Sequence, residues 1–242
     1  MPMPKKIKVR TSMVFERHEK KYLISEEVYQ GLLKRLQEYT HPDQFGLHTV
    51  CSLYLDSDDF ILANRSLGKP DYKEKLRLRS YGLPQPNTTV YLELKKKLKG
   101  VTYKRRIPLT YEAAERYMLL GEAAEERSQI MQEIDYFFHL YKPEPKILLF
   151  YERIALCGIE DEELRVTFDT NIRWRAHDLS LSQGDEGEMI LPPGTRLMEI
   201  KVADSFPLWL SRLLSEFKVY PASFSKYCTA YKLLQKEMHQ IC

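Results

Sequence analysis

Charged and apolar residues alternate along many short stretches of this 242-residue chain. The clearest stretch is KEKLRLRSYG, in which Lys75, Arg77 and Arg79 alternate with leucines. Successive side chains of a strand point to opposite faces, so this period of two predicts a strand with one charged and one apolar face. A row of cations on a half-buried strand is unfavourable unless an anion lies against it.

The same alternation recurs along most of the other predicted strands. Their charged faces carry Glu19 and Lys21, Glu93 and Lys95, Lys104 and Arg106, Arg153, Arg165 and Asp169, and Glu199 and Lys201. Solvation explains any single strand of this kind, because antiparallel sheets often have one wet face. Over six or seven strands a second explanation gains weight, in which the sheet closes around these side chains and gathers the cations in one cavity.

Such a cavity would need anions. Two like charges about 6 Å apart repel by about 3 kcal/mol at an effective dielectric constant of about 20. Arginine presents a planar fork that matches phosphate oxygens, and lysine adds point charges. Several linked phosphates would match a lined channel better than one phosphate would. For Asp169 a structural salt bridge is favoured over a role in orienting an arginine or touching a metal, and Asp56 and Asp58 fit turn and helix-cap roles better than metal binding.

Helical segments are interspersed among the strands. Ser25 is a predicted N-cap for a helix to about Tyr39, and a helical turn is expected over 58–68. Residues 111–141 predict two helices broken near Gly121, and two more helices are expected near the C-terminal end. The pattern predicts an α+β fold, with a large antiparallel sheet or closed β-barrel and flanking helices. We expect a flexible tail over 1–12 and a single domain over 13–242.

Composition limits the function classes. Lys plus Arg number 37 against 34 for Asp plus Glu, and a net charge of +3 is too mild for a general nucleic-acid coat. The basic N-terminal stretch is not followed by an apolar run, and no run approaches the ~18 apolar residues of a membrane span. The four cysteines are scattered, which favours reduced thiols. We expect a cytoplasmic protein without its own membrane segment, although a membrane protein could be a partner.

An ordered set of motifs resembles the VTC domain family. The motifs are FERHEKKYLI, SLYLDS, KLRLRSYG, YLELKKK, YERIAL, LRVTFDT, LMEIKV and SFSKY, between about Phe15 and Tyr231. VTC domains are polyphosphate polymerase domains of the vacuolar transporter chaperone complex and belong to the triphosphate tunnel metalloenzymes, close in fold to CYTH-type triphosphatases. The resemblance implies an antiparallel β-barrel that forms a tunnel, with charged side chains pointing inward.

The resemblance also implies roles for the residues at matching positions. The implied catalytic residues, which would hold the triphosphate and the growing chain, are Lys21, Arg77, Arg79, Lys95, Arg153, Arg165 and Lys226. Further substrate-binding residues would be Arg65, Lys75, Lys104, Lys201 and Ser225. Glu199 matches an acidic residue associated with Mn²⁺ or Mg²⁺, and Glu19 and Glu93 are further candidate metal ligands.

The implied activity is transfer of the ATP γ-phosphate onto a polyphosphate chain, so ATP and polyphosphate are the expected partners. Two positions depart from the pattern. Arg17 replaces a metal-binding glutamate of the wider superfamily, and Ser223 stands where VTC enzymes can have lysine. A metal-dependent hydrolase of tripolyphosphate or nucleoside triphosphates, and a non-catalytic polyphosphate-binding module, therefore stay open. An RNA-binding barrel is disfavoured because the aromatic motifs of RNA-binding sheets are absent.

Overall fold

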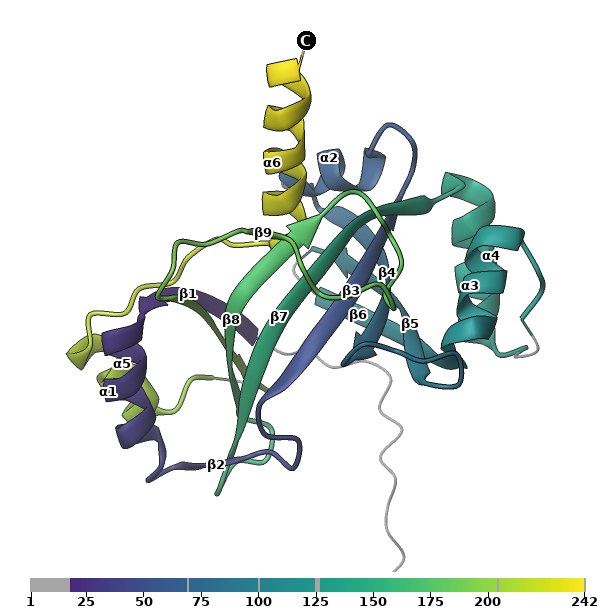
Figure 1. Cartoon of the computed structure of the whole chain (residues 1–242). Helices are drawn as coiled ribbons and strands as arrows, with labels where there is room; N and C mark the ends of the chain where they lie inside the picture. Colours follow the sequence, from purple (N-terminus) through teal and green to yellow (C-terminus); the bar gives the residue numbers. More distant parts are fainter. Residues whose placement is uncertain (1–17, 69, 100, 125–126, 204, 242) are drawn as a thin grey trace, which may run out of the picture.

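One antiparallel sheet forms the centre of the molecule, and helices pack against both of its faces (Figure 1). The computed structural model describes residues 18–241, apart from 69, 100, 125–126 and 204. The predicted tail over 1–12 and Arg17 lie outside the described residues. Among the described residues, no helix combines the length and the apolar character needed to cross a membrane.

The elements of the described residues follow the predicted order. The strands are β1 (His18–Ser25), β2 (Thr40–Pro42), β3 (His48–Asp56), β4 (Tyr72–Tyr81), β5 (Thr89–Leu98), β6 (Val101–Thr110), β7 (Glu144–Gly158), β8 (Arg165–Arg175), β9 (Glu188–Met189) and β10 (Thr195–Val202). The helices are α1 (Glu26–Leu36), α2 (Ile61–Leu67), α3 (Tyr111–Leu120), α4 (Gln129–Tyr141), α5 (Leu208–Glu216) and α6 (Lys226–Ile241).

The sheet is curved but does not close into a barrel. Its strand order is β1-β10-β8-β7-β3-β4-β5-β6, with β2 paired to β7 and β9 paired to β8. Over the described residues, the end strands β1 and β6 are not paired with each other. Part of the outer edge of β1 is instead taken by the segment before α6, since the Ala222 amide donates to the Lys21 carbonyl at 2.7 Å. The predicted α+β class is confirmed, and the predicted full closure is wrong.

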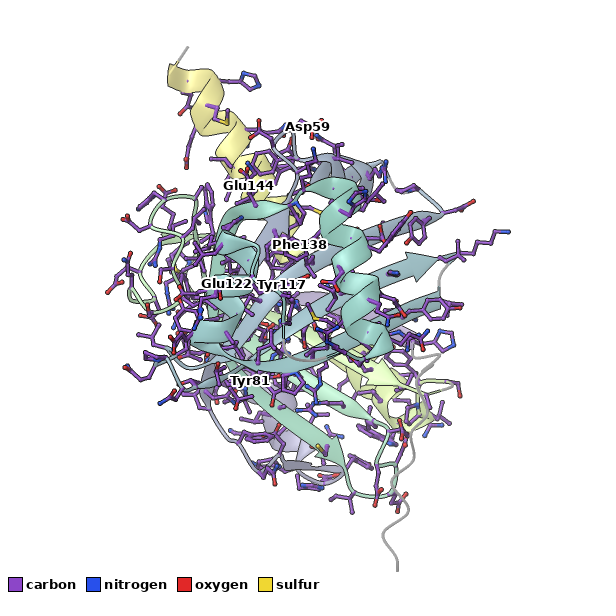
Figure 2. The ribbon with its side chains drawn as sticks, turned by 90° about the vertical axis from the view of Figure 1, so that its right-hand side faces the viewer. Asp59, Tyr81, Tyr117, Glu122, Phe138 and Glu144 are labelled. Atoms are coloured by element: carbon purple, nitrogen blue, oxygen red, sulfur yellow. The ribbon has the colours of Figure 1, made fainter. Side chains whose placement is uncertain are left out.

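The two faces of the sheet differ as the alternation predicts. The outer face of β3–β6 packs under α3 and α4 through residues such as Leu78, Leu92 and Ile134. Figure 2 shows Tyr117 and Phe138 on these two helices, and their rings meet edge to face with centroids 5.0 Å apart. A second apolar cluster joins the outer face of β1, β10 and β8 to α1 and α5. These two clusters cover the outer face of the sheet and leave the charged residues on the concave side, part of which α6 covers through Tyr227 stacked on Tyr54.

Local signals in the sequence explain several boundaries. The Ser25 hydroxyl accepts from the Val28 amide, which confirms the predicted N-cap of α1, although this helix ends at Leu36. Gly121, with a φ of 68°, ends α3 as predicted, because a left-handed φ suits glycine. The fully buried Asp56 carboxylate accepts from three amides around the start of α2 and from the Tyr227 hydroxyl. Its predicted cap role is therefore confirmed.

Candidate functional site

The concave face of the sheet encloses a cavity of about 140 Å³ that is rich in cations. The described lining residues with a positive charge are Lys21, Lys75, Arg77, Arg79, Lys95, Arg153, Lys201 and Lys226. The lining carboxylates are Glu19, Glu93 and Glu199, and the neutral lining residues are Tyr54, Tyr151 and Ser225. Eight cations against three carboxylates leave an excess of positive charge, so the cavity suits a polyanion.

The first wall of this cavity is built on neighbouring strands β4 and β5. Arg77 donates from Nε and Nη2 to the Glu93 Oε2 atom at 2.8 and 2.7 Å, and from Nη1 to the Tyr54 hydroxyl at 2.9 Å. Arg79 Nη1 lies 3.8 Å from the same Glu93 oxygen. Lys104 Nζ on β6 lies 2.5 Å from the other Glu93 oxygen. One buried carboxylate thus holds three cations in place.

The charge states in this wall follow from burial and from these partners. Burial raises the pKa of Glu93, but Arg77, Arg79 and Lys104 outweigh burial and hold that pKa well below its usual range. Burial lowers the pKa of Lys104 to about 8, although Glu93 opposes that shift. Cations lie within 2.8 Å of both oxygens of Glu93, so the geometry gives no support to its predicted role as a metal ligand. Glu93 instead orients the two arginines.

The second wall is built on β7, β8, β10 and the start of α6. Arg153 on β7 donates from Nε and Nη2 to the two Asp169 oxygens on β8 at 2.6 and 2.7 Å. Lys226 Nζ lies 2.5 Å from Asp169 Oδ2 and 3.5 Å from Glu199 Oε1. Burial favours the neutral form of Asp169, but Lys226 and Arg153 outweigh burial and lower its pKa. The hypothesis that Asp169 orients an arginine therefore agrees with the geometry.

Glu19 and Glu199 form a third part of the cavity, at which a metal ion could be held. The pairing of β1 with β10 sets Lys21 opposite Glu199 and Glu19 opposite Lys201. Lys21 Nζ lies 3.5 Å from a Glu19 oxygen and 3.4 Å from a Glu199 oxygen, and Lys201 Nζ also approaches both carboxylates. Lys95 Nζ on β5 lies 3.9 Å from Glu19 Oε2 on β1. This contact joins two strands that lie near opposite ends of the sheet order.

These two carboxylates fit a divalent cation only in part. Within the described part of the chain, no group of three or more His, Cys, Asp or Glu side chains is placed to hold a metal ion. Mg²⁺ usually binds to one or two carboxylates and takes its remaining ligands from substrate phosphates and water. Glu19 and Glu199 match that arrangement, provided that phosphate oxygens complete the coordination.

The segment before α6 brings distant residues into the cavity. Lys21 Nζ donates to the Phe224 carbonyl at 3.1 Å, and Lys75 Nζ donates to the Ser225 hydroxyl at 3.0 Å. These contacts link β1 and β4 to the two residues that precede α6. They place Ser225 and Lys226 at the cavity as predicted, whereas Ser223 is exposed.

Three predicted site residues lie outside the lining. Arg165, at the start of β8, extends past the cavity and donates to Asp43 Oδ2 at 2.7 Å. Arg65 lies on α2 and donates to the Tyr141 hydroxyl on α4 at 3.0 Å. Both side chains are thus held by partners away from the cavity. Lys104 also lies outside the lining, but it contacts the lining residue Glu93.

Two lining tyrosines are additions to the predicted set. Tyr151 accepts from Arg79 Nη2 at 3.1 Å, and its ring lies 4.4 Å from Lys226 Nζ. Burial opposes ionisation of the Tyr54 phenol, but Arg77, Arg79 and Lys75 outweigh burial and lower its pKa to about 8. The alternation did place Tyr151 on the same face as Arg153. It gave no sign that both phenols would contact arginines.

A curved antiparallel sheet around a cation-lined cavity defines a triphosphate-tunnel fold, and solved structures share this architecture. A candidate adenylate cyclase from Bacillus halodurans aligns with a TM-score of 0.55 and 14% identity, over 86% of this chain and 92% of that chain. A candidate adenylyl cyclase from Hippeastrum, described as having a dominant triphosphatase activity, aligns with a TM-score of 0.51 and 16% identity over the same shares. At these identities the likeness shows the fold alone.

The chain belongs to the VTC domain family, whose model matches residues 16–235. Subunit 4 of the vacuolar transporter chaperone complex from Trypanosoma brucei brucei is 25% identical over 216 residues, which cover 71% of this chain and 27% of that protein. The subunit of the same name from Schizosaccharomyces pombe is 22% identical over 222 residues, which cover 74% and 30%. The chain thus spans less than a third of the length of these relatives.

Proposed function

We propose that this chain is a polyphosphate polymerase that transfers the γ-phosphate of ATP to the end of a polyphosphate chain. The observation that carries this proposal is the cavity in which eight cations converge from the two walls and from the part formed by β1 and β10. Membership of the VTC domain family supports the same activity. The relatives are named as subunits of a complex, which supports a further proposal that this chain has protein partners.

Phosphoryl transfer depends mainly on positioning the reactants and neutralising their charge. Arg77 and Arg79 face the cavity from the first wall, and Arg153 and Lys226 face it from the second wall. Glu93 and Asp169 fix the arginines before any ligand binds, because each carboxylate holds its arginine through two donors. This preorganisation reduces the rearrangement that the transition state would otherwise require.

In the proposed reaction a terminal oxygen of the polyphosphate chain attacks the γ-phosphorus of ATP. A new P–O bond forms to the chain, the bond between the γ-phosphorus and the β,γ-bridging oxygen breaks, and ADP leaves with the bond's electron pair. Arg77, Arg79 and Arg153 would hold the non-bridging oxygens in line. Lys21 and Lys226, which now contact Glu199, would stabilise the transferring phosphoryl group.

A divalent metal belongs to the same proposal. Glu199 and Glu19 would hold Mn²⁺ or Mg²⁺ together with phosphate oxygens, and the bound ion would neutralise charge on the phosphates. Lys21 and Lys201 now offset these two carboxylates. With Glu19 and Glu199 engaged in this way, Lys21 and Lys201 would be free to contact the phosphates.

The test is to incubate the purified chain with ATP and Mn²⁺, with and without a short polyphosphate primer, and to resolve the products on a gel stained for polyphosphate. ADP and free phosphate are measured in the same sample. A growing ladder with matching ADP is the expected result. Free phosphate without a ladder would indicate a hydrolase, and tight polyphosphate binding without either product would indicate a binding module.

Arg77→Ala is expected to abolish the ladder while the circular dichroism spectrum stays unchanged. A matched control is Arg116→Ala, since Arg116 is an exposed arginine on α3 that pairs with Glu112 and Glu122. The control variant should form a normal ladder. Full activity of the Arg77→Ala variant would contradict the assignment of the cavity.

A further inference from the structure

Aromatic side chains gather beside one part of the cation-lined cavity. His48 on β3, Tyr81 on β4 and Tyr91 on β5 form what we call the mouth cluster. The ring centroids of His48 and Tyr81 are 5.8 Å apart, and those of Tyr81 and Tyr91 are 6.0 Å apart. Figure 2 shows Tyr81 below α3 and α4 in that view. The proposed phosphate chemistry does not use these rings.

The strand register places the mouth cluster on the same face as the cavity. Tyr91 pairs with Arg79 across β4 and β5, and His48 pairs with Arg153 across β3 and β7. Tyr81 follows Arg79 by two residues on the same strand, so both side chains point to one face. Each ring is therefore either the cross-strand partner of an arginine that lines the cavity or two residues away from such an arginine on the same strand. The rings are a continuation of the cavity wall.

The mouth cluster is accessible, unlike the tyrosines inside the cavity. Tyr54 and Tyr151 are buried, and both of their hydroxyls accept from arginines. Tyr81 is 48% exposed, and His48 and Tyr91 are half-buried. The exposed Arg106 guanidinium lies 4.8 Å from the centre of the Tyr91 ring and adds a second planar group at this site. The rings therefore offer a surface to a planar ligand that also reaches the cavity.

The chemistry of such a ligand follows from this continuity. The cavity suits linked phosphates, and the adjoining rings suit a planar aromatic group, since nucleobases stack on aromatic side chains with little dependence on base identity. A nucleoside triphosphate carries both parts in one molecule, whereas inorganic polyphosphate has no planar group. We propose that the mouth cluster binds the nucleoside end of the nucleotide substrate while the cavity holds its phosphates. This inference rests on the proposed function, in that the cavity must accept a nucleoside triphosphate.

The experiment compares two ligands that differ in the nucleoside. Binding of the non-hydrolysable β,γ-imido analogue of ATP and of inorganic tripolyphosphate is measured by titration calorimetry, so no turnover is required. Tyr81→Ala is expected to weaken binding of the nucleotide by about tenfold, the effect of losing one stacking ring, and to leave tripolyphosphate binding unchanged. Tyr81→Trp, which keeps an aromatic ring, should retain nucleotide binding. The control Tyr136→Ala removes a tyrosine that is 65% exposed on α4 and should change neither ligand.

The outcomes separate this inference from the proposed function. Unchanged nucleotide binding by the Tyr81→Ala variant, or equal weakening of both ligands, would overturn the role of the mouth cluster while the phosphate cavity stands. If the unmodified chain binds neither ligand, both the cavity assignment and the inference built on it fail. Selective loss of nucleotide binding would support both.

Discussion

Each wall of the cavity uses a buried carboxylate to hold its cations, but the two walls draw these residues from different parts of the chain. In the first wall, Glu93 holds Arg77, Arg79 and Lys104, all within three neighbouring strands. In the second wall, Asp169 holds Arg153 from the next strand and Lys226 from α6. The first wall therefore forms with local strand pairing. The second wall is complete only when the segment before α6 has docked, which couples this docking to the charge pattern of the site.

Loss of Asp169 is expected to have the largest effect on stability. The Asp169→Asn variant would leave Arg153 and Lys226, both largely buried, with only their longer contacts to Glu199, and removing one partner of a buried ion pair costs about 3–5 kcal/mol. Chemical denaturation followed by circular dichroism would measure this loss. A loss below about 1 kcal/mol would mean that the second wall does not depend on Asp169.

Glu93→Gln should lower the stability less than Asp169→Asn does, which would show that the second wall depends more on its carboxylate. Lys104 is 43% exposed on its side chain, so water can solvate it when the carboxylate is lost. We expect a stability loss of about 1–3 kcal/mol, the range for leaving buried polar partners unsatisfied. The same denaturation measurement checks the order of the two variants. An Asp169→Asn variant more stable than Glu93→Gln would reverse the proposed ranking.

The first wall should also give the cavity a pH dependence near 8. The pKa of Lys104 is lowered to about 8 and that of Tyr54 is lowered to about 8. As pH rises through 8, Lys104 loses its positive charge and Tyr54 gains a negative charge, so both changes weaken anion binding. Tripolyphosphate affinity should therefore fall between pH 7 and pH 9, and the fall should be smaller in Tyr54→Phe. Identical pH profiles for the two proteins would exclude a contribution from Tyr54.

Arg165 provides the smallest expected effect. The Arg165 side chain is 44% exposed and pairs with Asp43, whose side chain is 7% exposed, and neither residue lines the cavity. Arg165→Ala should change polyphosphate synthesis by less than about twofold, whereas Arg153→Ala should abolish it, because a change below 0.5 kcal/mol is expected for an exposed site. The gel assay described above compares them directly. An equal loss of polyphosphate synthesis in both variants would show that Arg165 acts in the site.

The alternation of charged and apolar residues predicted more of the first wall than of the second. In β4 the period of two placed Arg77 and Arg79 on the cavity face, and the hairpin to β5 placed Glu93 beside them. Alternation also placed Arg165 on the charged face of β8. The alternation does not tell how far along a strand the cavity extends, and Arg165 lies outside its lining. Asp43, in the loop after β2, captures Arg165 there, and this contact joins residues 122 apart in sequence.

Contacts that have no local signal in the sequence decide whether such a sheet closes. The alternation allows an open sheet or a closed barrel and the resemblance implies a barrel, yet the edge of β1 bonds to the backbone of Ala222. The second wall and the mouth cluster likewise depend on tertiary placement. Lys226 reaches Asp169 across 57 positions of sequence, and His48, Tyr81 and Tyr91 meet only because β3, β4 and β5 are neighbours in the sheet.

The central claim is that the two walls hold one polyphosphate ligand between them, and titration of inorganic tripolyphosphate into the chain tests it most directly. We expect one ligand per chain, with binding strongly weakened both by Arg79→Ala in the first wall and by Arg153→Ala in the second. Each variant must first show an unchanged circular dichroism spectrum. Binding that stays intact when either wall is altered, or two independent ligands per chain, would contradict a single site shared by both walls.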